Sequence, residues 1–321
     1  MAGQHTMMAQ QQYWSDLKER GSQWGPAAFA FLYRMFGRRA CLIVLGPVIA
    51  FFYVSGRVQR RASRDYLRRI WRLQGRPGQP GHWQSLRHFF AFGSAMLDKL
   101  ASWIGDIDRE AVTDLDGPVM AGVRADPQGA LILSAHVGNV EIVRAIAARH
   151  QKRRVHVIIH TKGAENFNRL IQKFAPSSSV RLIPAAEIGV GTAMFLSAAI
   201  ERGEWVVIMG DRTPVHGSGR TLSVPFLGAP AHFPLGPFLL MHALKCKTYL
   251  LLCYKQDGRY RVRFSRFGEG TAPMASDRQA VLQAHVQRYA AALEEILRDA
   301  PFQWFNFYEY WAPQPDRERA G

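Results

Sequence analysis

The chain has 321 residues, of which 48% are hydrophobic, and a formal net charge of +16. This length and hydrophobic content are enough for one large or two small folded domains, and they exclude a chain that is disordered throughout. The charge is uneven, because residues 1–105 alone carry 15 basic and 4 acidic side chains. Concentrated basic charge favours an anionic membrane, a nucleic acid or an acidic carrier protein as the partner.

Cysteines and the N-terminus indicate the compartment. Cys41, Cys246 and Cys253 are too few and too scattered for a disulfide framework or a metal site, which fits a reducing compartment. The first sixteen residues lack the basic patch followed by an apolar core that a secretory signal needs. We therefore expect the chain to stay on the cytoplasmic side of the membrane.

Two apolar segments, Pro26–Phe36 and Ala40–Val54, are separated by Gly37-Arg38-Arg39. As a helix the second segment would be about 22 Å long, shorter than a hydrocarbon core of about 30 Å. We also expect Gly46-Pro47 to interrupt it. The sequence thus leaves open whether this stretch spans the membrane as a single anchor or enters one leaflet only.

A stripe of arginines at helical spacing follows this apolar stretch. Its members are Arg57, Arg61, Arg64, Arg68 and Arg72. An apolar insertion joined to a basic amphipathic helix is typical of attachment to anionic lipid, so we predict an interfacial helix. The alternative is a buried core helix with a solvated arginine face. Nucleic acid is not expected as a partner, because zinc-finger spacing, an aromatic RNA-binding signature and a recognition-helix pattern are all missing from the sequence.

A turn-rich segment, Gly75–Gly81, divides a predicted membrane-associating helical region, residues 1–76, from a second region, residues 77–321. The second region opens with an apolar helix over His82–Ile104 and then alternates strands with helices. The expected strands are Ala130–Ser134, Val155–His160, Val180–Ile183, Trp205–Met209, Leu222–Phe226, Lys247–Tyr254 and Tyr260–Phe264. The expected helices are Asn139–His150, Ala164–Phe174, Gly191–Arg202, Leu235–Leu244 and Asp277–Arg298. This order predicts an α/β fold with a mixed sheet flanked by helices.

The strongest candidate for chemistry is the turn after the strand at Ala130. His136 lies in that turn and Glu141 in the first turn of the following helix, so the carboxylate is expected to orient the imidazole. A neutral histidine held in one tautomer can take a proton from an alcohol. The alternative is that Asn139 is only an N-cap, Glu141 a favourable first-turn acid and His136 an ordinary loop residue.

A second polar turn, Gly210-Asp211-Arg212-Thr213, follows the strand at Trp205. Because ligands collect at the carboxyl ends of strands in α/β sheets, the two turns are expected to face one crevice. Arg212 then becomes a candidate anion binder fixed by Asp211, with a surface ion pair as the alternative. The apolar loop that follows, residues 224–237, either lines an acyl groove or covers the core.

These motifs together resemble the lipid A biosynthesis late acyltransferases. The similarity covers His136-x4-Glu141 with Gly138-Asn139 between, the Gly210–Thr213 turn, Val224–Gly228 and Phe233–Pro237. It continues at Gly37-Arg38-Arg39, Ala62–Leu67 and the aromatic segment Pro301–Tyr308. Two departures are a shorter, broken N-terminal apolar stretch and Ala175–Ser179 in place of a more basic segment. They leave the membrane topology and the acceptor lipid open.

The resemblance implies transfer of a fatty acyl chain from an acyl carrier protein or CoA thioester to a hydroxyl of a lipid acceptor at the cytoplasmic face of the inner membrane. His136 would be the general base and Glu141 its orienting carboxylate. Substrate contacts are expected from Gly138, Asn139, Asp211, Arg212, Thr213, Phe226, Gly228, Phe233, Pro234 and Gly236. No metal or tightly bound cofactor is required. The acceptor is either a lipid A-type or another glycolipid, an amino-acid lipid or a polyene lipid.

Two further questions stay open in the sequence. The oxyanion of the tetrahedral intermediate would be stabilised either by backbone N–H groups at Gly138-Asn139 or by Arg212. The chain has no Gly-x-Ser-x-Gly motif, which favours direct attack by the acceptor hydroxyl over an acyl-enzyme. The competing function is a catalytically inactive protein on the same fold that binds a membrane or a partner, and the intact His136-x4-Glu141 pair argues against it.

Overall fold

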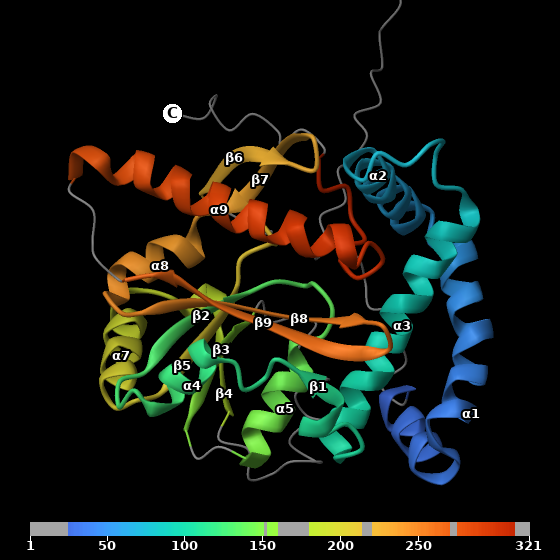
Figure 1. Ribbon diagram of the computed structural model, residues 1–321, viewed down its shortest axis with the longest axis horizontal. Coiled ribbons are helices and arrows are strands. Elements are labelled where there is room, and N and C mark those ends of the chain that lie inside the picture. The colour runs from blue at the N-terminus through green and yellow to red at the C-terminus, as the bar shows by residue number, and fades with distance from the viewer. Residues whose placement is uncertain (1–24, 151–152, 160–179, 214–219, 270–274, 312–321) are drawn as a thin grey trace, which may run out of the picture.

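The computed structural model describes residues 25–150, 153–159, 180–213, 220–269 and 275–311. A mixed sheet carries helices on both faces, and a layer of three further helices lies along one side (Figure 1). The helices are α1 (Gly25–Ser55), α2 (Arg57–Leu73), α3 (His82–Ile104), α4 (Pro118–Ala125), α5 (Val140–His150), α7 (Val190–Glu201), α8 (Gly236–Leu244) and α9 (Arg278–Asp299). The strands are β1 (Val112–Thr113), β2 (Ala130–Ser134), β3 (Val155–Ile159), β4 (Val180–Pro184), β5 (Trp205–Met209), β6 (Thr221–Phe226), β7 (Ala229–Pro234), β8 (Thr248–Gln256) and β9 (Arg259–Gly268).

The predicted α/β fold with a mixed sheet is confirmed. In the described chain the sheet has seven strands in the order β1-β9-β8-β2-β5-β3-β4. All neighbours are parallel except β8 and β9, which form an antiparallel pair. Strand β2 lies between β5 and β8, so its carboxyl end, and the turn that follows it, is at the centre of the sheet edge.

Strands β2 and β5 have the predicted bounds, and the other predicted strands differ by a few residues. One prediction was wrong: the segment after β6 is not a loop, because Ala229–Pro234 pairs antiparallel with β6 as strand β7. Strand β7 contains Pro230 and Pro234. Both strands of a two-stranded hairpin are edge strands, and edge strands tolerate proline. The helix predicted over Ala164–Phe174 lies outside the described residues.

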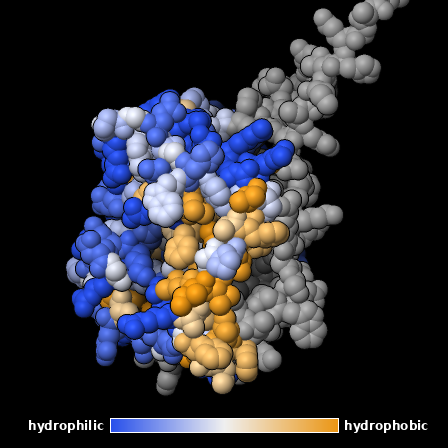
Figure 2. All heavy atoms as spheres, turned by 90° about the vertical axis from the view of Figure 1, so that its right-hand side faces the viewer, coloured by the Kyte–Doolittle hydropathy of each residue, from blue (hydrophilic) through white to orange (hydrophobic). Residues whose placement is uncertain are grey.

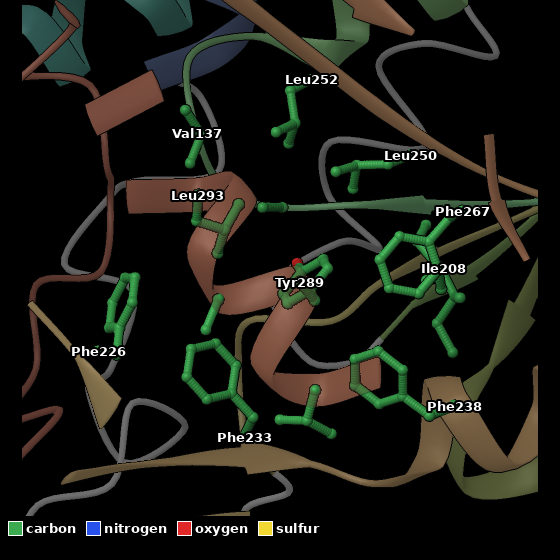
Figure 3. Close-up of a cluster of buried hydrophobic side chains, with 14 of the residues drawn as sticks. Val137, Ile208, Phe226, Phe233, Phe238, Leu250, Leu252, Phe267, Tyr289 and Leu293 are labelled. Atoms are coloured by element: carbon green, nitrogen blue, oxygen red, sulfur yellow. The ribbon is translucent and has the colours of Figure 1, made fainter. Parts of the chain in front are cut away.

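The sheet is buried on both faces, as its apolar strands require. Alternate side chains of β2 enter two cores: Leu131 and Leu133 join α8 and α9 on one face, while Ile132 joins α4 and α5 on the other. Figure 3 shows the larger core, in which aromatic side chains of the β6–β7 hairpin and of α8 surround Tyr289 of α9. These two cores hold the carboxyl end of β2 in a fixed position.

Helix α1 bends once, at Gly37, whose φ of 72° is readily adopted only by glycine. The break between the two apolar segments was therefore predicted at the right place. The interruption expected at Gly46-Pro47 was wrong, since the helix continues through Pro47 to Ser55. The stretch Phe31–Ser55 is long and apolar enough to cross a membrane by length and composition.

Helix α2 buries its apolar face in the protein, so this face is not available for insertion into a membrane as predicted for an interfacial helix. Leu67 and Ile70 are fully buried in the larger core, to which β2 and α9 also contribute, and Tyr66 packs against Trp304. Its apolar face is thus occupied by protein, whereas Arg57, Arg61 and Arg72 are exposed on the opposite side. The division of the chain at residue 76 stays a prediction.

Helices α1 and α3 pack side by side and expose apolar side chains along most of their length. Figure 2 shows hydrophobic side chains gathered on this face. Ile43 and Val54 of α1 are 77% and 72% exposed, and Trp83 of α3 is 73% exposed. The other exposed members on these two helices are Phe31, Met35, Phe36, Val44, Val48, Phe51, Phe90, Phe92 and Met96. A patch of this extent marks a contact with a membrane or with another protein.

Candidate active site

The candidate site is built on the carboxyl end of β2, which three hydrogen bonds fix in place. Ser134 Oγ donates to the Leu251 carbonyl (2.7 Å), and the Ser134 carbonyl accepts from Tyr289 Oη (2.7 Å) and from the Gly210 backbone N–H (2.9 Å). The last bond joins the ends of β2 and β5 directly. The turns that follow these two strands therefore start side by side, as predicted for the two polar motifs.

The turn after β2 needs glycine at position 138. Gly138 has a φ of 60°, and a Cβ atom there would lie 2.1 Å from the Cys253 carbonyl oxygen. Its N–H donates to the Gln303 carbonyl (2.7 Å), and the N–H of Asn139 donates to the Cys253 carbonyl (2.6 Å). Both N–H groups are therefore occupied by the protein and do not form an oxyanion hole.

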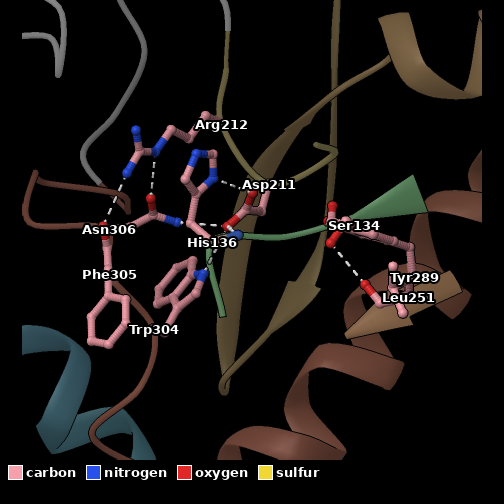
Figure 4. A network of polar contacts seen from close by, with 9 residues as sticks. All are labelled: Ser134, His136, Asp211, Arg212, Leu251, Tyr289, Trp304, Phe305 and Asn306. Carbon is pink, nitrogen blue, oxygen red and sulfur yellow. Dashed lines mark hydrogen bonds and ion pairs between the residues drawn. The ribbon is translucent and has the colours of Figure 1, made fainter. Parts of the chain in front are cut away.

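The imidazole of His136 is bonded to the buried carboxylate of Asp211 (Figure 4). Nδ1–H donates to Asp211 Oδ1 (2.8 Å), and the backbone N–H of His136 donates to Oδ2 of the same carboxylate (2.9 Å). With Asp211 ionised, Nδ1 carries the proton and Nε2 keeps its lone pair. The side chain of His136 is 29% exposed, so part of the ring is reachable from outside.

Asp211 is fully buried, and four donors stabilise its charge. Besides the two from His136, Oδ2 accepts from Trp304 Nε1 (3.0 Å) and Asn306 Nδ2 (3.0 Å). Asn306 in turn accepts a hydrogen bond from Arg212 Nε (2.8 Å), while Arg212 Nη2 donates to the Phe305 carbonyl (3.0 Å). Asn306 thus connects the carboxylate to the guanidinium, and the whole network is held by the protein before any substrate arrives.

Burial and charge shift the two pKa values in the same direction. Burial opposes ionisation of Asp211, but His136 and Arg212 outweigh it and keep the pKa of the carboxyl well below its usual range. Burial lowers the pKa of His136, and the positive charge of Arg212 lowers it further, against the opposing effect of Asp211. Both shifts favour an ionised carboxylate next to a neutral imidazole at neutral pH, which is the state a general base needs.

Glu141 does not have the position that its spacing predicted. Its carboxylate contacts Arg144, Trp103 and Lys99, which lie on α5 and α3, and the bond to the imidazole is made by Asp211 instead. The reason is geometric, because the turn ends before Glu141, whose side chain projects from α5 towards α3. Asp211 lies 75 residues from His136 in sequence but on the neighbouring strand end.

The residues predicted to line an acyl groove have different places. Phe226 and Phe233 are fully buried and pack against each other, with Phe226 also against Trp304, so both rings stabilise the core. Pro234 is also buried, Gly228 is exposed in the β6–β7 turn, and Gly236 is exposed at the start of α8. Thr213 is buried directly after Arg212.

Trp304 and Asn306 were not assigned to the site from the sequence. Their signal was an amide side chain within the aromatic run at residues 302–311, since a polar group in an apolar segment has to find a hydrogen-bond partner when it is buried. The same segment brings the site next to the apolar face of α3. The N–H of Phe305 donates to the His136 carbonyl (3.0 Å), and its ring packs against the exposed Phe92.

A neutral histidine bonded to a buried carboxylate, located at a sheet edge beside an exposed apolar helix, is the kind of pair that general acid–base catalysis uses. The model of the bacterial lipid A biosynthesis acyltransferase family matches residues 96–312, and the chain belongs to this family. It is therefore an acyltransferase that uses an acyl donor and a lipid acceptor. No curated protein matched the chain in a sequence comparison.

Proposed function

We propose that this enzyme transfers a fatty acyl chain from a carrier-protein or CoA thioester to a hydroxyl of a lipid A-type glycolipid or a related membrane glycolipid. The observation that carries the proposal is the His136–Asp211 pair: its imidazole is partly exposed, and its backbone is bonded to Phe305, whose ring packs on the apolar face of α3. A lipid acceptor can remain in the membrane while its head group reaches this imidazole.

In the proposed mechanism His136 Nε2 takes the proton of the acceptor hydroxyl while the oxygen attacks the thioester carbonyl. The new C–O bond gives a tetrahedral oxyanion, which collapses as the C–S bond breaks, and the imidazolium returns the proton to the leaving thiolate. Asp211 holds the tautomer and stabilises the imidazolium. The N–H groups of Gly138 and Asn139 are bonded elsewhere, so we assign the oxyanion to the positive charge of Arg212, which its bonds to Asn306 and Phe305 hold close enough to act on His136.

Direct attack by the acceptor is supported by the state of the cysteines. Cys41, Cys246 and Cys253 are all buried. Burial raises the pKa of the Cys246 thiol to about 11 and also raises that of Cys253, so neither forms the thiolate that accepts an acyl group. We therefore propose that no acyl-enzyme forms through a cysteine.

The membrane contact that we propose is the exposed face of α1 and α3, with the arginines of α2 at its border. Apolar side chains would enter the hydrocarbon of the cytoplasmic leaflet of the inner membrane, while Arg57 and Arg61 contact anionic head groups. This extends the membrane-associating region beyond the predicted residues 1–76 to include α3, and it assigns the insertion to α1 and α3, because the apolar side of α2 is buried.

The donor is proposed to be an acidic acyl carrier protein, in agreement with the net charge of +16. Electrostatic attraction accelerates the encounter of a basic and an acidic protein and is screened by salt. The second-order rate with a carrier-bound chain should therefore fall more steeply with ionic strength than the rate with a small neutral thioester. Identical salt profiles for both donors would favour CoA.

The central test is the variant His136→Ala, assayed by mass spectrometry of glycolipid acceptors incubated with acyl thioesters. Removal of a general base should lower the rate by about 10²- to 10⁴-fold. Wild-type melting temperature combined with wild-type activity in this variant would refute the assignment. Lipid extracts of cells with and without the gene, compared by mass, would identify the natural acceptor.

A further inference from the structure

The carboxylate of Glu141 organises a group of side chains between α3 and α5. Arg144 Nη2 lies 2.5 Å from Glu141 Oε2, and Trp103 Nε1 donates to the same oxygen (3.4 Å). Lys99 Nζ lies 4.0 Å from it. Arg144 also stacks on the Trp103 ring, with its guanidinium carbon 5.2 Å from the centroid. Glu141 is thus fixed by α5 and α3 together and holds a lysine ammonium at their junction.

Lys99 lies where α3 passes the His136 turn. Ala95, one turn earlier in α3, accepts a hydrogen bond from Asn139 Nδ2 (2.8 Å), so this part of the helix contacts the turn directly. Lys99 follows the exposed Phe92 and Met96 on the same stripe of α3, at spacings of seven and three residues. Lys99 therefore lies one turn of α3 beyond the residue that contacts the His136 turn.

The charge of Lys99 acts on the imidazole, because it is one of the groups that lower the pKa of His136. Burial lowers the pKa of Lys99 itself to about 8, an effect that Glu141 opposes and Arg144 increases. The side chain of Lys99 is 19% exposed, so it is not completely enclosed by the protein. Lys99 thus carries a positive charge at neutral pH and begins to lose it in the mildly alkaline range.

We propose that Lys99 binds an anionic oxygen of the reactants next to His136, and that Glu141 is the positioning residue that holds the ammonium there. The ligand chemistry is a phosphate oxygen of a substrate head group or the oxyanion that develops at the thioester carbonyl. The proposal rests on the proposed function, since it requires acyl transfer at His136. It gives Glu141 a role that does not depend on contact with the imidazole.

The surrounding charges are consistent with this role. Glu141 and Arg144 face Lys99 from α5, and Arg212 is bonded to Asn306 and Phe305. Asp98, the neighbour of Lys99 in sequence, is bonded to Arg38, Lys255 and Tyr260 and belongs to a separate cluster. The described ion pair of Lys99 is the one with Glu141, at 4.0 Å.

The experiment measures kcat and KM against pH for the full-length protein in phospholipid vesicles, with an acyl thioester and a phosphorylated glycolipid acceptor. The variants are Lys99→Met, Lys99→Arg, Glu141→Gln and Arg144→Met. We expect Lys99→Met to lower kcat/KM by about tenfold or more at neutral pH, the size of one lost charge-assisted contact. The acidic limb of the kcat/KM pH profile of this variant should also move to higher pH, because removing a cation raises the pKa of His136.

The alkaline limb distinguishes this role from a merely structural one. In the wild type kcat/KM should decline above a pH of about 8, where Lys99 deprotonates. Lys99→Arg should move this decline to higher pH, because a guanidinium keeps its charge. Glu141→Gln should move it to lower pH and Arg144→Met to higher pH, since they remove opposite charges that act on the same ammonium. Melting temperatures monitor folding, and the Lys99→Arg, Glu141→Gln and Arg144→Met shifts decide the question if Lys99→Met does not fold.

The kinetic constants separate the two sources of the anion. A raised KM in Lys99→Met that disappears with a dephosphorylated acceptor assigns the ammonium to a phosphate, whereas a lowered kcat with both acceptors assigns it to the oxyanion. Unchanged kcat, KM and pH profile in Lys99→Met would overturn the proposal. Absence of transfer by the wild type, or full activity in His136→Ala, would refute the proposed function instead.

Discussion

The carboxyl end of the sheet and the α1–α3 face use apolar residues in opposite ways. Leu131 and Leu133 of β2 are completely enclosed, whereas Ile43 and Val54 of α1 are among the most exposed large hydrophobic side chains of the described chain. Burial stabilises the first region from within the protein. The second region gains from its apolar groups only when something outside the protein covers them. The first should therefore control activity and folding, and the second attachment to the membrane.

The largest effect on activity is expected from replacing the buried carboxylate of Asp211. Asp211→Asn should lower the acyl-transfer rate by about 10²- to 10⁴-fold, because an amide no longer fixes the tautomer that leaves Nε2 basic. Glu141→Gln is the matched control and should cost clearly less at neutral pH. Steady-state acyl-transfer rates of both variants are compared with the wild type. A larger loss in Glu141→Gln than in Asp211→Asn would mean that Glu141, and not Asp211, orients the imidazole.

The next effect concerns the His136 turn and compares two glycines with positive φ. An alanine at Gly228 meets no atom within 4 Å, so Gly228→Ala should cost only the left-handed backbone, about 1–2 kcal/mol. Gly138→Ala adds a clash with the Cys253 carbonyl and should be much more destabilising, with loss of activity. Denaturant unfolding and activity assays measure both. Equal unfolding free energies for the two variants would mean that the turn adapts easily.

A third prediction tests the α1 face against the buried side of the same helix. Replacing Ile43 and Val54 by Ser should weaken binding to vesicles by about 1.5–3 kcal/mol per side chain, while the melting temperature hardly changes. Ile49→Ser, at a buried position, should instead destabilise the fold. Vesicle flotation and thermal melting report the two quantities. Unchanged flotation after the Ile43 and Val54 replacements would assign the face to a protein partner.

The smallest effect is expected from the arginines of α2. Gln at Arg57, Arg61 and Arg72 should weaken binding to anionic vesicles by up to about 1 kcal/mol per residue, an effect that salt suppresses, and leave binding to neutral vesicles unchanged. Flotation at low and at physiological ionic strength measures the difference. An equal loss on both vesicle types would point to damage of the helix rather than to lost charge.

The comparison also shows what the sequence could predict. The apolar run of β2, the break at Gly37 and the adjacency of the two polar turns follow from local patterns, and these predictions agree with the structure. The partner of His136 does not follow from local spacing, because Asp211 reaches it only through the pairing of β2 with β5. Phe226 and Phe233 were expected to contact substrate but are buried in the core. An apolar segment next to a site has the same sequence pattern whether it lines a groove or fills a core.

The hydrogen-bond donors of Asp211 also imply an order in which the site forms during folding. The carboxylate comes from residue 211 and the imidazole from residue 136, but Trp304 and Asn306, which complete the carboxylate's hydrogen bonds, are synthesised more than ninety residues later. A nascent chain that lacks this segment would have to bury Asp211 without two of its donors, which is costly. The reactive histidine should therefore acquire its final tautomer only after the aromatic segment has docked, so that truncated chains are inactive even when their sheet has formed.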